Sequence, residues 1–489
     1  MAGDLVVGLD SSTQSTKAIA WSREGEAVAE GRAPIESHTP RPGWVEQDME
    51  NWWDSACAAL TGLTQQVDPA RIAGLAISNQ RETVAFVGSD GAAARPAMVW
   101  LDERAVEELP LLVEAFGGQR LHAITGKPID VTPVVYRLSW MKHHEPEVLA
   151  RTARILDVHG FLTGRLTGRS AASWTSADPF GVLDIADKAW SAPILEHLGL
   201  TAERLGDLVR PGETIGKVTE SAATATGLRA GTPVVAAGGD GQCAGLGVNA
   251  TRPGTIYLNL GTALITGAWS PEAAIGAYWR TMTSPTGEGY FLEGCQRAGA
   301  FFINWLIDSF AGGREDPAIF ERLEAQAAAI PVGSEGVTVC PYLTGCMDPH
   351  WNPKARAAFE GLGPSHGIGH LYRASLEALT LESARCIEAM ARNGIVSERI
   401  LAVGGGAKSA IWTRMFADAT GLPLTRSDSL EASALGAGMS AAVGIGWFEG
   451  FDQAAAAMSR AGPTIQPDPA RAEQWAKLSD RQSKVYRLS

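Results

Sequence analysis

The chain has 489 residues, of which 45% are hydrophobic and 19% charged, and this composition excludes a disordered or collagen-like protein because enough apolar surface is present to form a core. The formal net charge of −13 argues against general binding to nucleic acid or to an anionic membrane, so no such partner is expected. Six cysteines without a C-x-x-C pair, together with the lack of a basic leader or a long apolar run, predict a reduced, cytoplasmic location.

Strand-like and helix-like segments alternate along the chain, and this alternation favours an α/β protein. In the first half, apolar runs predict strands at Leu5–Leu9 and Lys17–Trp21, on either side of a polar turn. A helix is predicted over Trp52–Leu63, and a further buried strand over Ile72–Ile77. The chain therefore opens with two strands that a tight polar turn connects.

The middle of the chain repeats this opening pattern. Strands are predicted at Thr255–Leu260 and Ala263–Trp269, and the turn Gly261-Thr262 connects them. A strand–turn–strand unit at the start of each half suggests two similar domains. We place the boundary in the Gly-rich stretch 238–245, which gives domains at residues 1–245 and 246–489. That stretch is typical of a loop, although a helix that links the domains is an alternative.

A glycine-rich strand end lies near the C-terminus. The predicted strand Arg399–Val403 runs into Gly404-Gly405-Gly406 and then into a predicted helix at Ala410–Thr420. Small residues at this point allow a nucleotide to approach the backbone at the helix N-terminus, but a plain strand-to-helix turn explains them equally well. A last, Ala-rich helix is predicted over Ser433–Val443.

The two polar turns are candidates for binding a polyphosphate. The turn Asp10-Ser11-Ser12-Thr13 offers backbone N–H groups to a phosphate and a carboxylate to a hydrated Mg²⁺, and Gly261-Thr262 has the same shape. Each turn taken alone is more simply an ordinary hairpin. Two such loops that face one cleft, however, can clamp a polyphosphate from both sides.

Two further groups of side chains are candidates for chemistry. Asp240, among glycines after an apolar run, could accept a proton from a substrate hydroxyl or belong to an Asp-Gly turn. Gln80, Arg81 and Glu82 follow a buried strand and could bind vicinal hydroxyls or form a solvated ion pair. Trp100 could add an aromatic wall to that pocket or lie in the core.

Together these motifs resemble the FGGY carbohydrate kinases, a family that includes xylulokinase, gluconate kinase and glycerol kinase. The opening Gly8-Leu9-Asp10-Ser11-Ser12-Thr13 is similar to the family's first phosphate motif. The segment Ala357-x-Phe359-x-Gly361-Leu362, followed after seven residues by His370-Leu-x-x-Ala374-Ser-Leu-Glu377, fits the family's C-terminal signature at every defined position. Gly404 to Trp412 resembles its adenosine motif, and Glu431 to Gly438 the stretch that follows.

The resemblance implies an α/β fold of two ribonuclease H-like domains, of the actin, hexokinase and chaperone-ATPase type, that flank a cleft. It implies transfer of the γ-phosphoryl group of ATP to a sugar hydroxyl, with Asp240 as the catalytic base and Asp10 near a Mg²⁺ ion. The first domain is expected to bind the sugar, through Gln80, Arg81, Glu82, Trp100, Asp240 and Gln242. The phosphates and the nucleotide are expected to contact Ser12, Thr13, Lys17, Gly261, Thr262, Gly405, Gly406 and Ser409.

Several departures from the family's patterns concern the substrate. Xylulokinases typically carry Met-His in place of Arg81-Glu82, the pair that binds polyol hydroxyls in glycerol kinase. The Tyr that glycerol kinases place near Thr132 is missing, and Arg137 replaces the usual Lys of the first family signature. The chain outside the pocket nevertheless resembles the xylulokinases, as in the surroundings Ala244-Gly-Leu-Gly247. On that resemblance we expect a ketopentose such as xylulose, and Arg81-Glu82 makes glycerol or another polyol the alternative.

Two functions of other classes stay open alternatives. The same architecture serves actin- and chaperone-like ATPases, which phosphorylate no sugar. A kinase-like sensor would bind sugar without turning it over. The partner that the resemblance implies is a small-molecule sugar or polyol, and a homodimer is an open alternative for the assembly.

Overall fold

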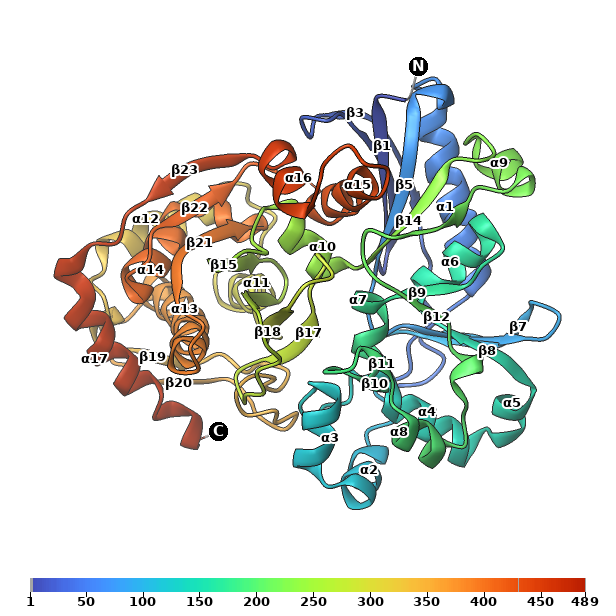
Figure 1. Cartoon of the computed structure of the whole chain (residues 1–489). Coiled ribbons are helices and arrows are strands. Elements are labelled where there is room, and N and C mark those ends of the chain that lie inside the picture. The colour runs from blue at the N-terminus through green and yellow to red at the C-terminus, as the bar shows by residue number, and fades with distance from the viewer. Residues whose placement is uncertain (1–2, 430, 489) are drawn as a thin grey trace.

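Two large β-sheets form the centres of the two halves of the chain in the computed structural model, which describes residues 3–429 and 431–488 (Figure 1). The strand order of the first sheet is β13 (Thr214–Lys217), β14 (Pro233–Gly239), β5 (Ile72–Asn79), β1 (Leu5–Ser11), β2 (Ser15–Trp21) and β3 (Ala27–Pro34). The strand order of the second sheet is β17 (Arg280–Thr283), β18 (Tyr290–Gln296), β16 (Leu264–Ser270), β15 (Gly254–Leu260), β21 (Ser397–Val403), β22 (Leu424–Ser427) and β23 (Ala461–Ile465).

The two sheets share one topology. In the first sheet, β1, β2 and β3 form an antiparallel meander, and β5 and β14 continue the sheet parallel to β1. In the second sheet, β15, β16 and β18 form the meander, and β21 and β22 continue parallel to β15. An antiparallel strand, β13 or β23, follows at the edge of each series. The predicted α/β fold with two similar halves is therefore confirmed.

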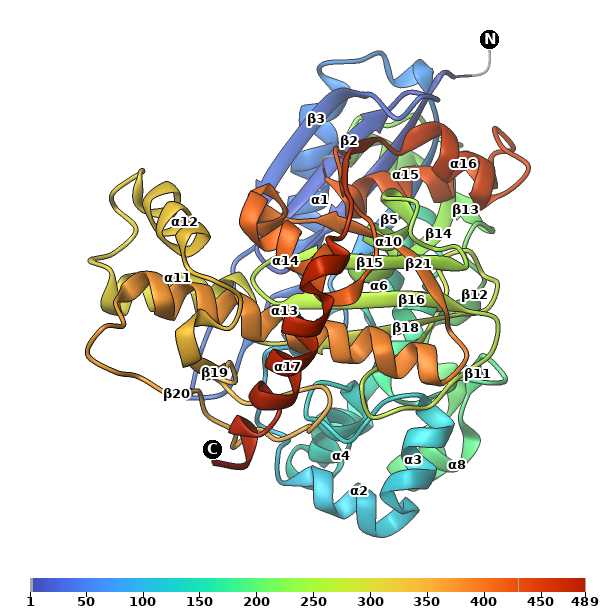
Figure 2. The same ribbon diagram turned by 90° about the vertical axis from the view of Figure 1, so that its left-hand side faces the viewer.

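Helices cover both faces of each sheet. α1 (Met49–Thr64) and α6 (Val158–Thr167) pack on one face of the first sheet. α13 (Ile368–Arg392) and α14 (Ala410–Thr420) pack on one face of the second. Figure 2 shows α13 together with α17 (Ala472–Gln482) across that outer face. The apolar residues of β1 and β15 alternate between the two faces because successive side chains of a strand point in opposite directions.

The remaining elements extend the two halves. A four-stranded sheet contains β4 (Glu46–Gln47), β7 (Ala93–Met98), β6 (Val84–Gly88) and β8 (Thr152–Leu156). The shorter strand pairs are β10 (Leu183–Asp184) with β11 (Ala189–Trp190), β12 (Asp207–Val209) with β9 (Ala171–Ser173), and β19 (Thr338–Cys340) with β20 (Ala358–Glu360). The other helices are α2 (Glu108–Phe116), α3 (Gly118–Thr125), α4 (Val134–His144), α5 (Pro146–Arg151), α7 (Trp174–Ala177), α8 (Ala192–Leu198), α9 (Glu220–Thr226), α10 (Asp240–Gly247), α11 (Ala300–Phe310), α12 (Ile319–Ala329), α15 (Ala432–Gly444) and α16 (Phe451–Met458).

The Gly-rich stretch around residue 240 is a helix rather than a loop. β14 ends at Gly239, and α10 begins at Asp240 and contains three glycines. These glycines allow close helix packing, because a Cβ added at Gly247 would lie 2.1 Å from the Ala432 carbonyl oxygen. A Cβ at Gly436 of α15 would likewise lie 1.9 Å from the Cys243 carbonyl oxygen. The loop interpretation is wrong here because the glycines serve packing, not a turn.

α10 and α15 cross between the two halves. α10 follows the first sheet, yet its Ala244 packs with Tyr257 and Phe291 of the second sheet. α15 follows the second sheet, yet its Leu435 belongs to the apolar cluster on the first sheet that includes Val6. Figure 1 shows α15 beside β1 and close to α10. The two halves therefore share these two helices.

Among residues 3–429 and 431–488, the structure contains no helix whose length and apolar character would let it span a membrane.

Candidate active site

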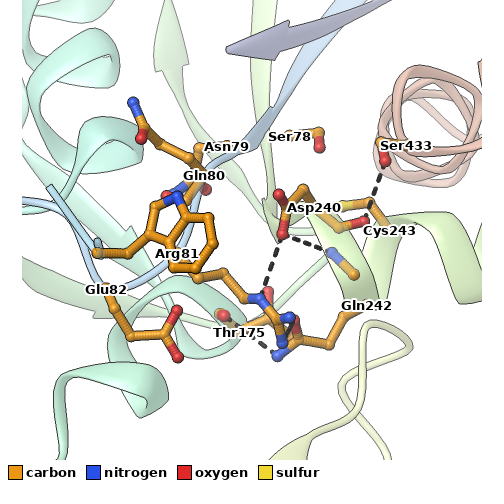
Figure 3. Close-up of polar contacts among 12 residues, drawn as sticks. Ser78, Asn79, Gln80, Arg81, Glu82, Thr175, Asp240, Gln242, Cys243 and Ser433 are labelled. Carbon is orange, nitrogen blue, oxygen red and sulfur yellow. Dashed lines mark hydrogen bonds and ion pairs between the residues drawn. The ribbon is translucent and has the colours of Figure 1, made fainter. Parts of the chain in front are cut away.

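Most of the predicted sugar-site residues lie at one edge of the first sheet. β1, β5 and β14 run parallel, so their carboxyl ends share that edge. Asp10 lies near the end of β1, Arg81 and Glu82 follow β5, and Asp240 follows β14. Figure 3 shows the residues that follow β5 opposite Asp240 at the start of α10. The fold thus brings together residues that are far apart in the sequence.

Asp240 is held on one side and open on the other. Its Oδ1 accepts a hydrogen bond from the Gly241 N–H at 2.7 Å and lies 3.2 Å from Arg81 Nε, while its side chain is 38% exposed (Figure 3). Loss of hydration raises the pKa of Asp240 above its ordinary value, and the Arg81 guanidinium opposes that rise. A carboxylate with this combination of support and access can accept a proton from a bound hydroxyl.

Arg81 and Gln242 form a buried support beside Asp240. Arg81 Nη1 donates to Gln242 Oε1 at 3.2 Å, and Gln242 Nε2 donates to the Thr175 carbonyl at 3.3 Å. Gln242 is fully buried. Both the oxygen and the nitrogen of the Gln242 side-chain amide therefore have protein partners, and the position of this predicted sugar ligand favours a role in holding Arg81.

The second half of the chain supplies two partners that the sequence analysis missed. Glu293 of β18 pairs with Arg81 at 2.9 Å, and Arg280 of β17 pairs with Glu82 at 2.6 Å and with Glu293 at 2.7 Å. For Glu293 the available signal was a carboxylate inside the mostly apolar strand Tyr290-Phe-Leu-Glu293, whereas Arg280, the first residue of β17, gave no comparable signal. Arg81 and Glu82 are consequently engaged in buried ion pairs rather than solvated.

The other two predicted sugar ligands differ in exposure. Gln80 is buried, and its side chain donates to Gln47 at 2.9 Å and accepts from Thr83 at 3.1 Å. Trp100 is 38% exposed, and its indole N–H donates to the Thr13 hydroxyl at 2.9 Å. Trp100 therefore connects the pocket wall to the first polar turn, whereas Gln80 stabilises the loop after β5.

Asp10 has surroundings that fit a cation. It is buried, and the Ser78 hydroxyl donates to its Oδ1 at 2.8 Å. Burial, with the nearby Asp240 charge as the second cause, raises the pKa of Asp10 to about 7. A divalent cation would offset this concentration of negative charge. Within the described ranges, no group of three or more acidic, His or Cys side chains could hold a metal ion by itself. The Mg²⁺ ion near Asp10 stays a prediction.

Hydrogen bonds close the first polar turn, and ion pairs lie beside it. Ser12 donates from both its backbone N–H and its hydroxyl to the Ser15 carbonyl, at 3.0 and 2.8 Å. Lys17 on β2 forms a 2.7 Å ion pair with Glu431 from the second half, and Arg32 contacts the other oxygen of that carboxylate at 2.9 Å. Phosphate contacts by Ser12, Thr13 and Lys17 stay predictions.

The predicted nucleotide residues lie at the equivalent edge of the second sheet. Gly261 and Thr262 connect β15 to β16, and their carbonyls accept from Ala300 and Gly299 at the start of α11, at 2.8 and 3.0 Å. Because β15 and β21 are parallel, the glycines after β21 share this edge.

The three glycines after β21 differ in their surroundings. Gly404 has a φ of 88°, and a Cβ there would lie 2.6 Å from Asn259 Oδ1. Gly405 is exposed and faces open space, since an added Cβ would meet no atom within 4 Å. Gly406 packs against Trp412, and the Ser409 hydroxyl caps α14 by accepting from the Trp412 N–H at 3.2 Å. Of these residues, Gly405 presents the barest surface to a ligand.

A pocket of about 430 Å³ lies between the two halves. Glu103 and Asp130 line it from the first half, and Arg297 and Trp351 from the second. Arg297 bridges the pocket, with 3.4 Å to Glu103 and 3.7 Å to Asp130. The two halves therefore face each other across a pocket with a largely apolar wall, in which Glu103, Asp130 and Arg297 are charged members.

Comparison with known proteins identifies the family. The model of the N-terminal domain of the FGGY family of carbohydrate kinases matches residues 5–247, and the model of its C-terminal domain matches residues 256–445. The chain belongs to the FGGY family of carbohydrate kinases. The enzyme class expected from the sequence, an ATP-dependent sugar kinase, is thereby confirmed.

Similar proteins of this family span nearly the whole chain. A glycerol kinase from Aromatoleum aromaticum is 30% identical, with 92% of each chain covered. A xylulose kinase from Bacillus subtilis is 26% identical, with 98% of this chain and 96% of the relative covered. The crystal structure of a xylulose kinase from Rhodospirillum rubrum superposes with a TM-score of 0.94 at 30% identity, covering 99% of this chain and 98% of that chain.

Proposed function

We propose that the protein phosphorylates a ketopentose such as xylulose, with Asp240 as the base. The observation that carries the proposal is the placement of Asp240, which is exposed on one side and held by Arg81 on the other. Similarity to xylulose kinases over the whole chain supports the ketopentose. The division into a sugar-binding domain at 1–245 and an ATP-binding domain at 246–489 is part of the same proposal.

The residues of the first half would prepare the hydroxyl for attack. Asp240 accepts the hydroxyl proton while the oxygen attacks the γ-phosphorus, and Arg81 keeps the carboxylate oriented. Asp10 would hold Mg²⁺, which supplies positive charge to the phosphates when bound. Backbone N–H groups of both polar turns would donate to phosphate oxygens, and closure of the two halves around the substrates would limit access of water to the γ-phosphate.

A second candidate function is phosphorylation of glycerol or another polyol. The 30% identical glycerol kinase and the Arg81-Glu82 pair favour it. Against it, both side chains already have buried partners in Glu293 and Arg280.

The charge of the same network disfavours a sugar acid as the substrate. The network contains three carboxylates and two guanidiniums, which gives it a formal charge of −1; its members are Glu82, Glu293, Asp240, Arg81 and Arg280.

A substrate panel in a coupled assay of ADP release tests the proposal. We expect kcat/KM for D-xylulose to exceed that for glycerol by at least about tenfold, because a shorter substrate leaves polar groups of the site unpaired. Gluconate should be a still poorer substrate. Faster turnover of glycerol than of any ketopentose would replace the proposal by the polyol kinase.

The panel also separates the functions of other classes. ADP release that no sugar stimulates would favour an actin- or chaperone-like ATPase. Calorimetric sugar binding without turnover would favour a sensor. A cytoplasmic location is consistent with free thiols at Cys57, Cys243, Cys295, Cys346 and Cys386, and it stays a prediction, as does a homodimer.

A further inference from the structure

The candidate base is the end of a chain of alternating charges that crosses from one half of the molecule to the other. Asp240 lies 3.2 Å from Arg81, and Arg81 lies 2.9 Å from Glu293. Glu293 lies 2.7 Å from Arg280, and Arg280 lies 2.6 Å from Glu82. Two of these five residues, Glu293 and Arg280, come from the second half of the chain.

We propose that Glu293 and Arg280 are positioning residues for phosphoryl transfer, which hold the Arg81 guanidinium in the orientation that fixes Asp240. This proposal rests on the proposed function, since it assumes that Asp240 is the base. It assigns to the second half of the chain a part in preparing the sugar hydroxyl, in addition to the expected binding of ATP.

Burial distinguishes this network from ordinary surface ion pairs. Only Asp240 is open to solvent, whereas the side chains of Arg81 and Glu293 are 9% and 0% exposed. Burial by itself would raise the pKa of Glu293, but the guanidiniums of Arg81 and Arg280 lower this pKa to about 2. Glu293 therefore stays ionised. Buried ion pairs contribute little net stability because of desolvation. Their fixed geometry is therefore better explained by orientation of Asp240, the one member that is exposed.

The residues around Asp240 are small where Arg81 needs space. A Cβ added at Gly239 would lie 2.7 Å from Arg81 Cδ. A Cβ added at Gly241 would lie 2.9 Å from Arg81 Nη2 and 3.1 Å from Glu293 Oε2. The two glycines that flank Asp240 thus leave room for the Arg81 guanidinium and its carboxylate partner Glu293. This explains the Gly239-Asp240-Gly241 sequence, just as helix packing explains Gly247.

Backbone contacts keep the far end of the network in place. The Thr281 N–H donates to the Gly126 carbonyl at 2.8 Å, and the Thr283 N–H donates to Asp178 Oδ2 at 2.7 Å. These bonds hold β17 against the first half at Thr281 and Thr283, so Arg280 is presented to Glu82. Glu82 itself has a φ of 51°, a backbone conformation that non-glycine residues adopt at a cost in free energy. In this conformation its side chain forms the ion pair with Arg280.

The chemistry explains why Glu293 is needed. A guanidinium has donors in a fixed fork, and Arg81 divides them among Asp240, Gln242 and Glu293. Without the Glu293 carboxylate, the fork is free to turn fully toward Asp240 and pair with both its oxygens. The carboxylate would then be less available to a hydroxyl and would lie in a different place.

The decisive variant is Glu293→Gln, which keeps the shape of the side chain and removes its charge. We expect kcat with the best sugar to fall on the order of 100-fold, as a misplacement of about 1 Å can cost that much, while the KM for ATP stays within about twofold. Glu293→Asp keeps the charge and should recover at least a part of kcat. The matched control is Glu288→Gln, which removes the exposed carboxylate that pairs with Arg210 beside the same hairpin, and it should behave as the wild type.

The outcomes are distinguishable. A folded Glu293→Gln enzyme with wild-type kcat, beside an inactive Asp240→Asn enzyme, would overturn the inference and leave the proposed function intact. An active Asp240→Asn enzyme would overturn the proposed function itself. If Glu293→Gln does not fold, as judged by thermal unfolding, Gly241→Ala replaces it, since its methyl group would contact Arg81 Nη2. Gly241→Ala should lower kcat without changing the KM for ATP, and an unchanged kcat would overturn the inference.

Discussion

The two halves of the molecule have the same sheet topology but carry different chemistry at the equivalent edge. At the ends of β1, β5 and β14, the first half presents the charged residues Asp10, Arg81 and Asp240. At the ends of β15 and β21, the second half presents glycines and backbone, as at Gly261 and Gly405. The fold therefore determines where a ligand can bind, and the residues at the strand ends determine which chemistry is available there.

The two edges are also joined by reciprocal ion pairs. Glu82 of the first half reaches Arg280 of the second at 2.6 Å, and Glu431 of the second half reaches Lys17 of the first at 2.7 Å. Both glutamates have a φ near 50°. The comparison thus teaches that the charged edge of the first sheet and the glycine-rich edge of the second come from different parts of the sequence but are connected by ion pairs.

The largest expected effect comes from removing the charge of Asp240 at the edge of the first sheet. Asp240→Asn should lower kcat by about 10³-fold, because general base catalysis contributes 10²–10⁴-fold, and should leave the KM for ATP unchanged. Steady-state kinetics of ADP release measure both parameters. The control Asp187→Asn removes an exposed carboxylate far along the chain and should have wild-type kinetics. A residual kcat above a tenth of the wild-type value would remove Asp240 from its proposed role.

A smaller effect should follow from filling the bare space at the second edge. Gly405→Val should raise the KM for ATP by about 30-fold, since steric overpacking costs typically 1–3 kcal/mol, with little change in the KM for the sugar. Varying each substrate at saturation of the other measures the two constants. Gly367→Val is a matched control, because an added Cβ at Gly367 also meets no atom within 4 Å. If the sugar KM rose instead, the assignment of the two edges would be reversed.

The smallest expected effect on activity concerns the helices between the parallel strands of each sheet. α14 begins at the neutral cap Ser409, whereas α6 begins at Asp157, whose Oδ1 accepts from the Gly160 N–H. Burial raises the pKa of Asp157 from 3.8 to about 7. The folded state therefore binds the proton more tightly, so this contribution to stability is complete below about pH 4 and is lost as the pH rises through 7.

Asp157→Asn keeps the oxygen that caps α6 and removes the charge. The variant would therefore have a neutral cap at α6, as the second half has at α14. Its stability relative to the wild type should rise by about 4 kcal/mol between pH 4 and pH 8, as linkage over this pKa difference requires. Urea unfolding at both pH values measures the difference. A difference that is constant with pH would mean that Asp157 stays ionised throughout.

Sequence reasoning predicts the segments whose pattern is local. β1, β2, β15 and β16 follow from apolar runs beside polar turns, and the predicted bounds of α14, Ala410–Thr420, are those of the structure. Asp240 and Arg81 are also brought to one edge, because parallel strands end together. Such features depend on a few consecutive residues or on one rule of topology.

The features that sequence reasoning missed depend on contacts between distant residues. The glycines of α10 suggest a loop, and only contacts with distant residues explain them in a helix: Gly241 leaves room for Arg81, and Gly247 packs against α15. The partners Glu293 and Arg280 lie about 200 positions from Arg81 and Glu82, with separations of 212 and 198, so no spacing indicates them. Gln80 and Gln242 have the composition of sugar ligands, but their amides already bind protein groups.

The crossing of α10 and α15 has a consequence for any attempt to divide the protein. A cut at residue 245 would leave the first fragment without α15, whose apolar side covers Val6, Ile19 and Val235. Exposed apolar strands of this kind promote aggregation. Neither fragment would then be a self-sufficient folding unit, and a split version of the enzyme would regain its structure only when both pieces are made together.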